Sequence, residues 1–159
     1  MTSTIRPLAD ADVNDVVQLS IRAWAPVFES VAKVLGPEIF AHIYGADWRI
    51  YQEKDVRATC VAKPTWVAEA AGVVAGFTAL DLSSNADEGE IYMLAVDPSF
   101  QRRGLGTTLT RFGIEQIRAA GKRVAVVGTG GDPGHGPARH TYSRAGFTSL
   151  PIVRSWMIL

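Results

Sequence analysis

The stretch Glu90-Ile-Tyr-Met-Leu-Ala-Val96, followed directly by Asp-Pro-Ser-Phe-Gln-Arg-Arg-Gly-Leu-Gly106, decides the fold of this chain. Beyond Glu90 its first half is apolar on both faces, which is typical of a central strand covered on both sides. Its second half is polar and glycine-rich, and apolar residues then recur at helical spacing from Leu105 to Ile117. The stretch therefore predicts a buried strand that leads through a tight turn into an amphipathic helix.

Further strands flank this unit. Thr65–Ala70 and Val73–Asp81 have strand character, and Ala71-Gly72 between them predicts a two-residue hairpin turn. Val124–Val127 is a short apolar run that predicts a second buried strand after the helix. The centre of the chain thus predicts a sheet of several neighbouring strands.

The first third of the chain is predicted to be mainly helical. Ile5 begins a short edge strand, and Asp10 or Asp12 is expected to cap the helix that follows, because a carboxylate accepts the unpaired amides of a first turn. Pro26 is expected to end or kink that helix. A second helix is predicted over Pro37–Lys54, with several aromatic residues on it.

The end of the chain is predicted to close the sheet. Pro137–Ala145 predicts a short helix that stops at Gly146, and Phe147–Thr148 and Arg154–Ile158 have strand character. The predicted order is β-α-α-β-β-β-α-β-α-β, a mixed α/β sheet. Because no linker or internal repeat interrupts the pattern, residues 1–159 are expected to form a single domain.

Composition excludes several classes of protein. The chain has 16 basic and 16 acidic residues, so it lacks the positive charge of a typical nucleic-acid binder. Its apolar runs are far shorter than a membrane span, and its N-terminus lacks an apolar signal core. A lone cysteine, Cys60, supports neither a disulfide nor a zinc site. We therefore expect a cytoplasmic protein with no metal, nucleic-acid or membrane partner.

The glycine-rich turn predicts an anion site. Gly104 and Gly106 allow backbone amides at a helix N-terminus to approach a ligand closely, and that end of a helix favours negative charge. Arg102 and Arg103 add donors suited to phosphate oxygens. Together these residues predict a pyrophosphate cradle, although a glycine-rich turn with solvated arginines would look the same. No Walker loop is present in the sequence.

Two motifs then point to one family. Gln101–Gly106 resembles the Q/R-x-x-G-x-G/A loop of the GNAT family of N-acetyltransferases, which holds the pyrophosphate of acetyl-CoA. The segment from Ala138 to Phe147 resembles the A-x-x-x-Y-x-x-x-G-F motif of the same family, with Tyr142 at the tyrosine position. The resemblance covers about Trp66 to Leu159, and its two motifs occur in the family's order.

The resemblance implies an acetyl-CoA-dependent enzyme that moves the acetyl group directly to a primary amine. The acceptor is open: a small molecule, a peptide N-terminus or a protein lysine. The strand from Glu90 splays from the next strand in this family, and the pantetheine arm fills the wedge. The residues implied to bind the cofactor are Leu94, Ala95, Val96, Gln101, Arg102, Arg103, Gly104, Leu105, Gly106, Thr107, His135 and Arg139.

Two residues are implied to catalyse the transfer. Tyr142 matches the general acid that protonates the departing thiolate, although a half-buried tyrosine on an amphipathic helix is the alternative. Glu90 stands where relatives carry a base, although it also fits a solvated strand end, and some relatives use no base. His135 replaces the family's usual asparagine; it is expected to bind CoA or carry protons, or else to be a surface histidine.

Other functions remain open at this point. A CoA-binding sensor without turnover would keep the same cradle, and a transferase for a longer acyl-CoA would need only a wider wedge. The glycine-rich loop Gly128–Pro137 lacks the spacing of a dinucleotide fingerprint, so NAD binding is rejected. A homodimer through the C-terminal strands is the remaining partner prediction.

Overall fold

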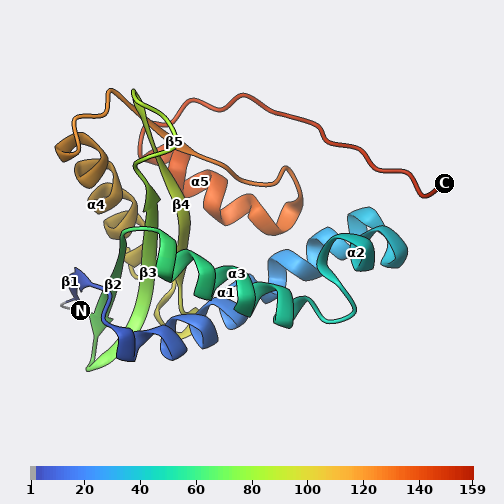
Figure 1. Cartoon of the computed structure of the whole chain (residues 1–159), viewed down its shortest axis with the longest axis horizontal. Coiled ribbons are helices and arrows are strands. Elements are labelled where there is room, and N and C mark those ends of the chain that lie inside the picture. Colours follow the sequence, from blue (N-terminus) through green and yellow to red (C-terminus); the bar gives the residue numbers. More distant parts are fainter. Residues whose placement is uncertain (1–2) are drawn as a thin grey trace.

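The computed structural model describes residues 3–159 and contains a five-stranded sheet in the order β1-β2-β3-β4-β5 (Figure 1). Neighbouring strands from β1 to β4 are antiparallel, whereas β5 runs parallel to β4. The predicted mixed α/β sheet is confirmed: three of the predicted strands have the correct bounds at both ends, and the strand predicted from Glu90 starts two residues earlier. The strands are β1 Ser3–Pro7, β2 Thr65–Ala70, β3 Val73–Asp81, β4 Glu88–Val96 and β5 Val124–Val127.

Five α-helices surround the sheet in the described part of the chain, and three short 3-10 turns connect to them. The helices are α1 Val13–Leu35, α2 Pro37–Tyr44, α3 Trp48–Ala62, α4 Leu105–Ala119 and α5 Gly136–Arg144. The 3-10 turns are η1 Asp10–Asp12, η2 Pro98–Phe100 and η3 Pro133–His135.

The core has two layers, one on each face of the sheet. Helices α1 and α3 cover one face, where Phe77 and Leu19 are fully buried. Helix α4 covers the other face, where Leu109 and Leu80 are fully buried. Each such side chain contributes about 1.5 to 3 kcal/mol by leaving water, so packing on both faces holds the sheet as the middle layer of the fold.

In the first third of the chain, the first helix does not end at Pro26, which was one of the two outcomes expected there, and the single helix predicted over Pro37–Lys54 was wrong. Helix α1 continues past Pro26, because Phe28 beyond it stacks on Trp48 of α3 with ring centroids 4.3 Å apart. This packing offsets the backbone hydrogen bond that proline cannot donate. The helix predicted over Pro37–Lys54 is two helices: Gly45 has a φ of 79° and ends α2, and Asp47 caps α3 by accepting from the amide of Arg49 at 3.0 Å.

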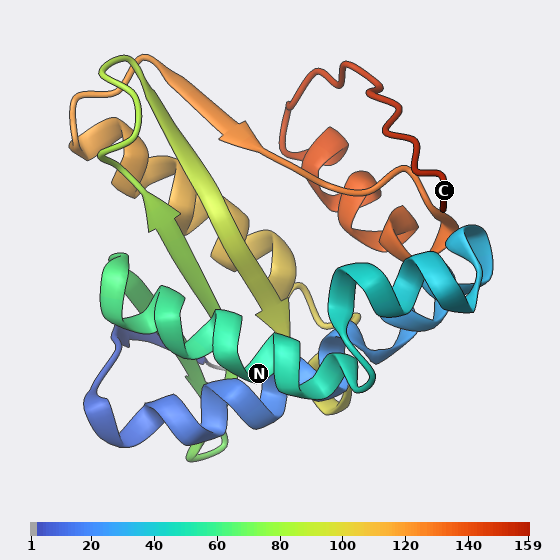
Figure 2. The same cartoon turned by 45° about the vertical axis from the view of Figure 1, so that its right-hand side comes forward.

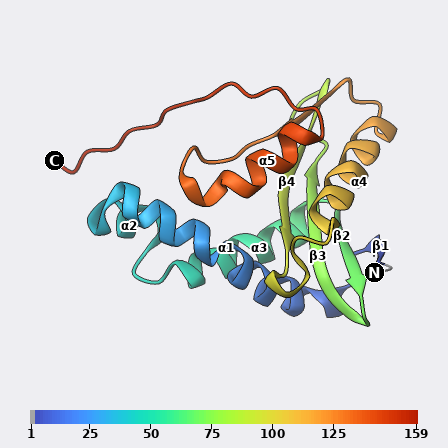
Figure 3. The ribbon, with the colours of Figure 1, turned by 180° about the vertical axis from the view of Figure 1, so that it is seen from behind.

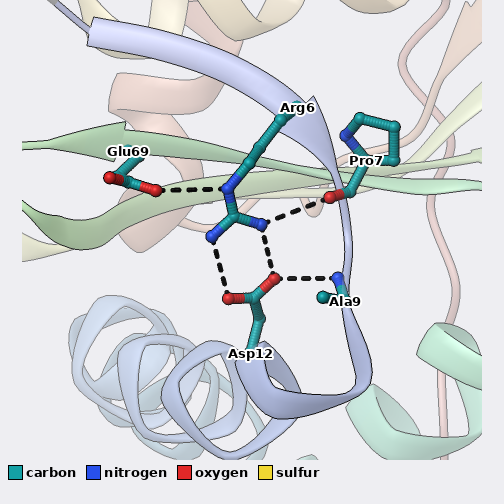
Figure 4. Close-up of polar contacts among 5 residues, drawn as sticks. All are labelled: Arg6, Pro7, Ala9, Asp12 and Glu69. Carbon is teal, nitrogen blue, oxygen red and sulfur yellow. Dashed lines mark hydrogen bonds and ion pairs between the residues drawn. The ribbon is translucent and has the colours of Figure 1, made fainter.

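Contrary to the prediction from the sequence, the side chain of Asp12 makes no capping hydrogen bond to α1. It joins an ion-pair cluster instead (Figure 4). Arg6 of β1 donates to both carboxylate oxygens of Asp12, at 2.7 and 3.0 Å, and to Glu69 of β2 at 3.1 Å. Asp12 also accepts from the backbone amide of Ala9 at 2.8 Å. A bidentate guanidinium is a stronger partner than one free amide, and it ties the start of α1 to the sheet edge.

The sheet opens between its last two strands. Strand β5 pairs with β4 only from Glu88 to Ile91, so the second half of β4 has no neighbour on that side among the described residues. Figure 2 shows β5 diverging from β4, with α5 beyond the gap. The splayed pair is confirmed, but β5 is not a buried strand: Val124 is 47% exposed, because β5 is the edge of the sheet.

The two closing strands predicted over Phe147–Thr148 and Arg154–Ile158 are absent from the described chain. Residues 147–159 form an extended segment without helix or strand, which runs away from the sheet (Figure 3). Its apolar side chains are exposed, Ile152 and Met157 by 82% and 76%. Pro151 and the lack of a paired neighbour explain why β propensity alone forms no strand here. Separately, none of the helices within residues 3–159 is long and apolar enough to cross a membrane.

Candidate active site

A cleft of about 910 Å³ lies where β4 and β5 separate. It is lined by α1, the second half of β4, the turn after β4, the first turns of α4, and the loop and helix that follow β5. The same strand edge that lacks a partner therefore forms one wall. Unpaired strand edges present backbone N–H and C=O groups, which an extended ligand can use as a neighbouring strand would.

The turn after β4 is held from both sides. Asp97 caps η2 by accepting from the amide of Ser99 at 2.9 Å, and its other oxygen accepts from Arg22 of α1 at 2.5 Å. Gln101 donates from Nε2 to the carbonyl of Val96 at 3.0 Å. These bonds fix the conformation of the turn before Gly104. The amide group of Gln101 is used in this internal hydrogen bond to Val96.

The glycines of this turn leave its backbone open. Gly104 has a φ of 84° and is the N-cap of α4, a conformation that glycine adopts without cost. A Cβ built on Gly104 would have no atom within 4 Å, and one on Gly106 only Val96 Cγ2 at 3.9 Å. Arg102 also has a positive φ, 61°. The space over the N-terminus of α4 is thus free for an anion.

Among the described residues, the charged side chains that line the cleft are positive. The described residues that line it include Arg102, Arg111 and Arg144, and they include no aspartate or glutamate. Arg103 does not line the cleft; its guanidinium lies over the ring of Phe100, 5.8 Å from the centroid. A cleft walled by arginines and helix amides favours a ligand with several negative charges.

Tyr142 of α5 lines the cleft and is 9% exposed. Its ring meets Phe147 edge-on at a centroid distance of 5.9 Å, and Phe147 packs against the core cluster of Leu80, Ile91 and Ile117. Burial raises the pKa of Tyr142 to about 12. The hydroxyl therefore keeps its proton at neutral pH and can serve as a donor.

Glu90 lies at the margin of the cleft. It is not among the described residues that line the cleft, and its Oε1 lies 4.0 Å from the position of a Cβ built on Gly128. Burial and the charge of Asp81 raise the pKa of the Glu90 carboxyl, while Lys63 opposes them. Lys63 itself forms an ion pair with Asp81 at 2.6 Å.

The loop after β5 folds on itself. Asp132 caps η3, and its carboxylate contacts Nδ1 of His135. Arg139 donates from Nη1 to the carbonyls of Gly130 at 2.6 Å and Asp132 at 2.8 Å. Arg139 therefore holds the loop, while His135 lines the cleft.

The structure brings most of the predicted residues together. Those that line the cleft are Leu94, Ala95, Val96, Gln101, Arg102, Gly104, Gly106, Thr107, His135 and Tyr142. Leu105 is buried in the core at 4% exposure, so only its backbone is available to a ligand. Sequence reasoning missed Arg111, although its spacing of one helical turn from Thr107 could have identified it. It also missed Asp132, one turn before His135.

Comparison with known proteins fits this geometry. Residues 36–147 match the Acetyltransferase (GNAT) family. A mycothiol acetyltransferase of Cellulomonas flavigena is 40% identical over 77 residues, which cover 48% of this chain and 22% of that protein. An uncharacterized N-acetyltransferase of Methanocaldococcus jannaschii is 28% identical over 161 residues, with 98% and 65% covered. The chain thus spans less than two thirds of the length of either relative.

A solved structure shows the same fold. The GNAT family acetyltransferase of Brucella melitensis, determined in complex with acetyl-CoA, superposes with a TM-score of 0.63 at 24% identity. The superposition covers 93% of this chain and 84% of that one. With the family match extending over more than half of its residues, the chain belongs to the GNAT family of acetyltransferases.

Proposed function

We propose that this protein transfers the acetyl group of acetyl-CoA directly to a primary amine. The observation that carries the proposal is the cleft between β4 and β5, which combines an unpaired strand edge, three arginines without a carboxylate, and the buried hydroxyl of Tyr142. Acetyl-CoA has the matching parts: a peptide-like arm, phosphate groups and a thioester. Both substrates would occupy the cleft together.

The cofactor would be held mainly by backbone groups. Leu94, Ala95 and Val96 supply the open edge of β4, where an amide can also polarise the thioester carbonyl. The pyrophosphate would lie over the first amides of α4, within reach of the exposed Arg102 side chain. The further residues in this proposal are Gln101, Arg103, Leu105 and Thr107 by their backbone or side chains, and Gly104 and Gly106 by the space they leave.

Tyr142 would be the general acid. A thiolate leaving group needs a proton, and a phenol that remains protonated at neutral pH can donate one. The alternative role, a tyrosine that only fills the core, would leave turnover unaffected when its hydroxyl is removed.

The acceptor class in this proposal is a primary amine on a small molecule, a peptide or a protein. Several relatives are named mycothiol acetyltransferase, but even one of the longer of these matches, to the protein of Thermomonospora curvata, covers only 51% of that protein, so the acceptor does not transfer with the name. Trp24, Val27 and Tyr92 line the cleft on the side of α1 and give its acceptor end an apolar, aromatic wall.

The first experiment is a thermal-shift titration with acetyl-CoA, free CoA and a longer acyl-CoA. A ligand at about a hundred times its Kd stabilises the fold by about 2.7 kcal/mol, which raises the Tm of a domain of this size by about 5 to 10 °C. We expect wild type and Tyr142→Phe to shift alike and Arg102→Ala to shift less. Arg118→Ala, at the far end of α4, is the matched control, since its side chain is 66% exposed.

The second step measures thiol release with glycinamide, spermidine, glucosamine and hydroxylamine as acceptors. Release that requires acetyl-CoA and an amine supports the transferase. Binding without release by any amine would favour a CoA sensor, and a larger shift with the longer thioester would favour a different acyl donor. If no CoA species shifts the melting curve, the proposal is wrong.

A further inference from the structure

The loop between β5 and α5 holds a histidine beside a carboxylate at the cleft. Nδ1 of His135 contacts Oδ1 of Asp132, and the two side chains are 20% and 8% exposed. His135 lines the cleft, whereas Asp132 lies behind it. The imidazole is therefore held by one nitrogen, and its other nitrogen, Nε2, is left for a ligand.

The pair is held in place by three elements. Ser30 of α1 accepts from the amide of Gly134 at 2.9 Å and donates its own proton to Asp132. The amide of Gly134 also reaches Oδ2 of Asp132 at 3.0 Å. Arg139 of α5 holds the backbone of the loop from the other side. Figure 1 shows the loop reaching from β5 toward α1 before it enters α5.

Close packing makes this position specific. A Cβ built on Gly134 would lie 2.7 Å from Cβ of Ser30 and 2.9 Å from Cα of Val27. Only a glycine lets the loop approach α1 so closely. A solvated surface histidine would need neither this approach nor a buried carboxylate partner.

The arrangement has the chemistry of a positioned base. A carboxylate that accepts from Nδ1–H fixes the tautomer with the lone pair on Nε2, and it stabilises the imidazolium once Nε2 has taken a proton. Glu90 has raised basicity but lies at the cleft margin. Of the two, His135 is the one that lines the cleft.

We propose that His135 is the base that deprotonates the acceptor amine and that Asp132 is its positioning residue. The inference rests on the proposed acetyl transfer. Nε2 of His135 takes one proton from the ammonium group and releases it to solvent. The free nitrogen then forms its bond to the acetyl carbon as the carbon–sulfur bond breaks. Tyr142 gives its proton to the sulfur and regains one from the new amide nitrogen, so that one proton is released in total.

Other charged and titratable groups face this pair from each neighbouring element. Arg139 comes from α5, Tyr44 from α2, and Glu29 and Lys33 from α1 beside Pro133 and Gly134. Asp132 is among the charges that raise the pKa of the Tyr44 hydroxyl, after burial and Tyr51. None of these groups is substituted in the variants compared below, so they do not account for differences between those variants.

The first test needs no acceptor. Imidazole ¹⁵N NMR of the wild type, Asp132→Asn and His135→Gln reads the tautomer directly, because the signals that disappear in His135→Gln are those of His135 and not of the other two histidines. We expect the proton of neutral His135 on Nδ1, with this preference weakened in Asp132→Asn. A proton on Nε2 in the wild type would overturn the proposal, because that nitrogen could not accept another.

The second test compares His135→Gln, Asp132→Asn and Glu90→Gln in thiol release from about pH 6 to about pH 9. With glycinamide or spermidine, which enter protonated, His135→Gln should lose about 100-fold or more at neutral pH and recover as the amine deprotonates. Hydroxylamine is already unprotonated, so its rate should fall little. Asp132→Asn should show a smaller loss and a shifted pH profile.

The outcomes separate this inference from the proposed function. An intact acetyl-CoA thermal shift in His135→Gln with lost amine turnover supports it. The same shift with unchanged turnover and pH profile, or a loss found in Glu90→Gln alone, overturns the base assignment and leaves the transferase standing. Absence of any acetyl-CoA shift in the wild type removes the proposed function instead.

Discussion

Two Asp-Pro turns border the cleft, and they begin alike. Asp97 and Asp132 are each the N-cap of a 3-10 turn, each precedes a proline, and each accepts from the backbone amide two residues further on, at 2.9 and 3.0 Å. Both carboxylates also bond to α1, through Arg22 and Ser30 respectively. One helix thus positions both turns with the same local device.

The turns differ in what they present to the cleft. The first continues into Gly104 and the N-terminus of α4, so it offers backbone amides and open space. The second turns its carboxylate onto His135 and so offers one oriented side chain. The comparison teaches that an Asp-Pro cap only fixes a position. In the proposed mechanism, the residues that follow it decide whether the turn binds an anion or carries a proton.

The largest effect is expected from a change that leaves both turns intact. Tyr142→Phe removes the buried hydroxyl and keeps the ring that packs on Phe147. We expect kcat for thiol release to fall about 100-fold or more, because the departing thiolate loses its proton donor. The acetyl-CoA thermal shift should stay as in the wild type. A kcat within a few-fold of wild type would show that the Tyr142 hydroxyl does not donate the proton to the thiolate.

The second prediction concerns the turn at Asp132, which is proposed to carry the proton. Gly134→Val places a Cβ against Ser30 and the backbone of Val27, so the loop must move off α1. Overpacking of this kind costs about 1 to 3 kcal/mol, a fall in Tm of about 2 to 12 °C. Urea unfolding and thiol release should both show the change.

Gly131→Val in the same loop is the matched control, since its Cβ would meet no atom within 4 Å. The control should unfold close to wild type. If both variants are equally stable and active, the approach of the loop to α1 does not position His135.

The third prediction separates strain from ligand contact in the anion-binding turn. Gly104→Ala forces an L-residue to a φ of 84°, which costs about 1 to 2 kcal/mol. Gly106→Ala in α4 carries no such strain and should be as stable as wild type or slightly more stable. Both should weaken acetyl-CoA binding, measured by titration calorimetry, because both add a methyl group at the cradle. Unchanged affinity in both would place the pyrophosphate elsewhere.

The comparison also explains what could be predicted from the sequence. The turn proposed to bind the anion could be placed from the sequence because its signal is local: strand, Gln101–Gly106 and helix follow one another in the chain. The position of Tyr142 at the cleft could be predicted for the same reason. The contact of the second turn with α1 could not be predicted, because Ser30 and Gly134 meet only in the folded chain. His135 was noticed, but its link to Asp132 became visible only with the loop folded.

The errors in the fold have the same origin. Pro26 predicted an end or a kink, and the helix does not end there, because the aromatic packing of Phe28 on Trp48, which no local pattern encodes, stabilises it beyond the proline. The strands predicted after Gly146 rest on β propensity alone, and residues 147–159 have no strand beside them. The break at Gly45 was different, since glycine followed by Asp47 was a local signal that could have been used.

The smallest effect should come from the charge that anchors the anion-binding turn. Burial raises the pKa of the Asp97 carboxyl, but hydrogen bonds from Arg22 and Ser99 outweigh burial and leave the pKa below its ordinary value of 3.8. A lowered folded-state pKa stabilises the fold at pH values above the unfolded value. This stabilisation disappears as the pH falls through the folded value.

Asp97→Asn keeps the cap and removes the charge. We expect a loss of about 1 kcal/mol at neutral pH, because the Arg22 side chain is 54% exposed and solvent screens the pair. The gap to wild type should narrow below about pH 4, where the wild-type carboxylate of the unfolded chain is protonated. Urea midpoints across that range measure it, with the exposed Asp10→Asn as control. A constant gap at all pH values would mean that the hydrogen bonds, and not the charge, hold this turn to α1.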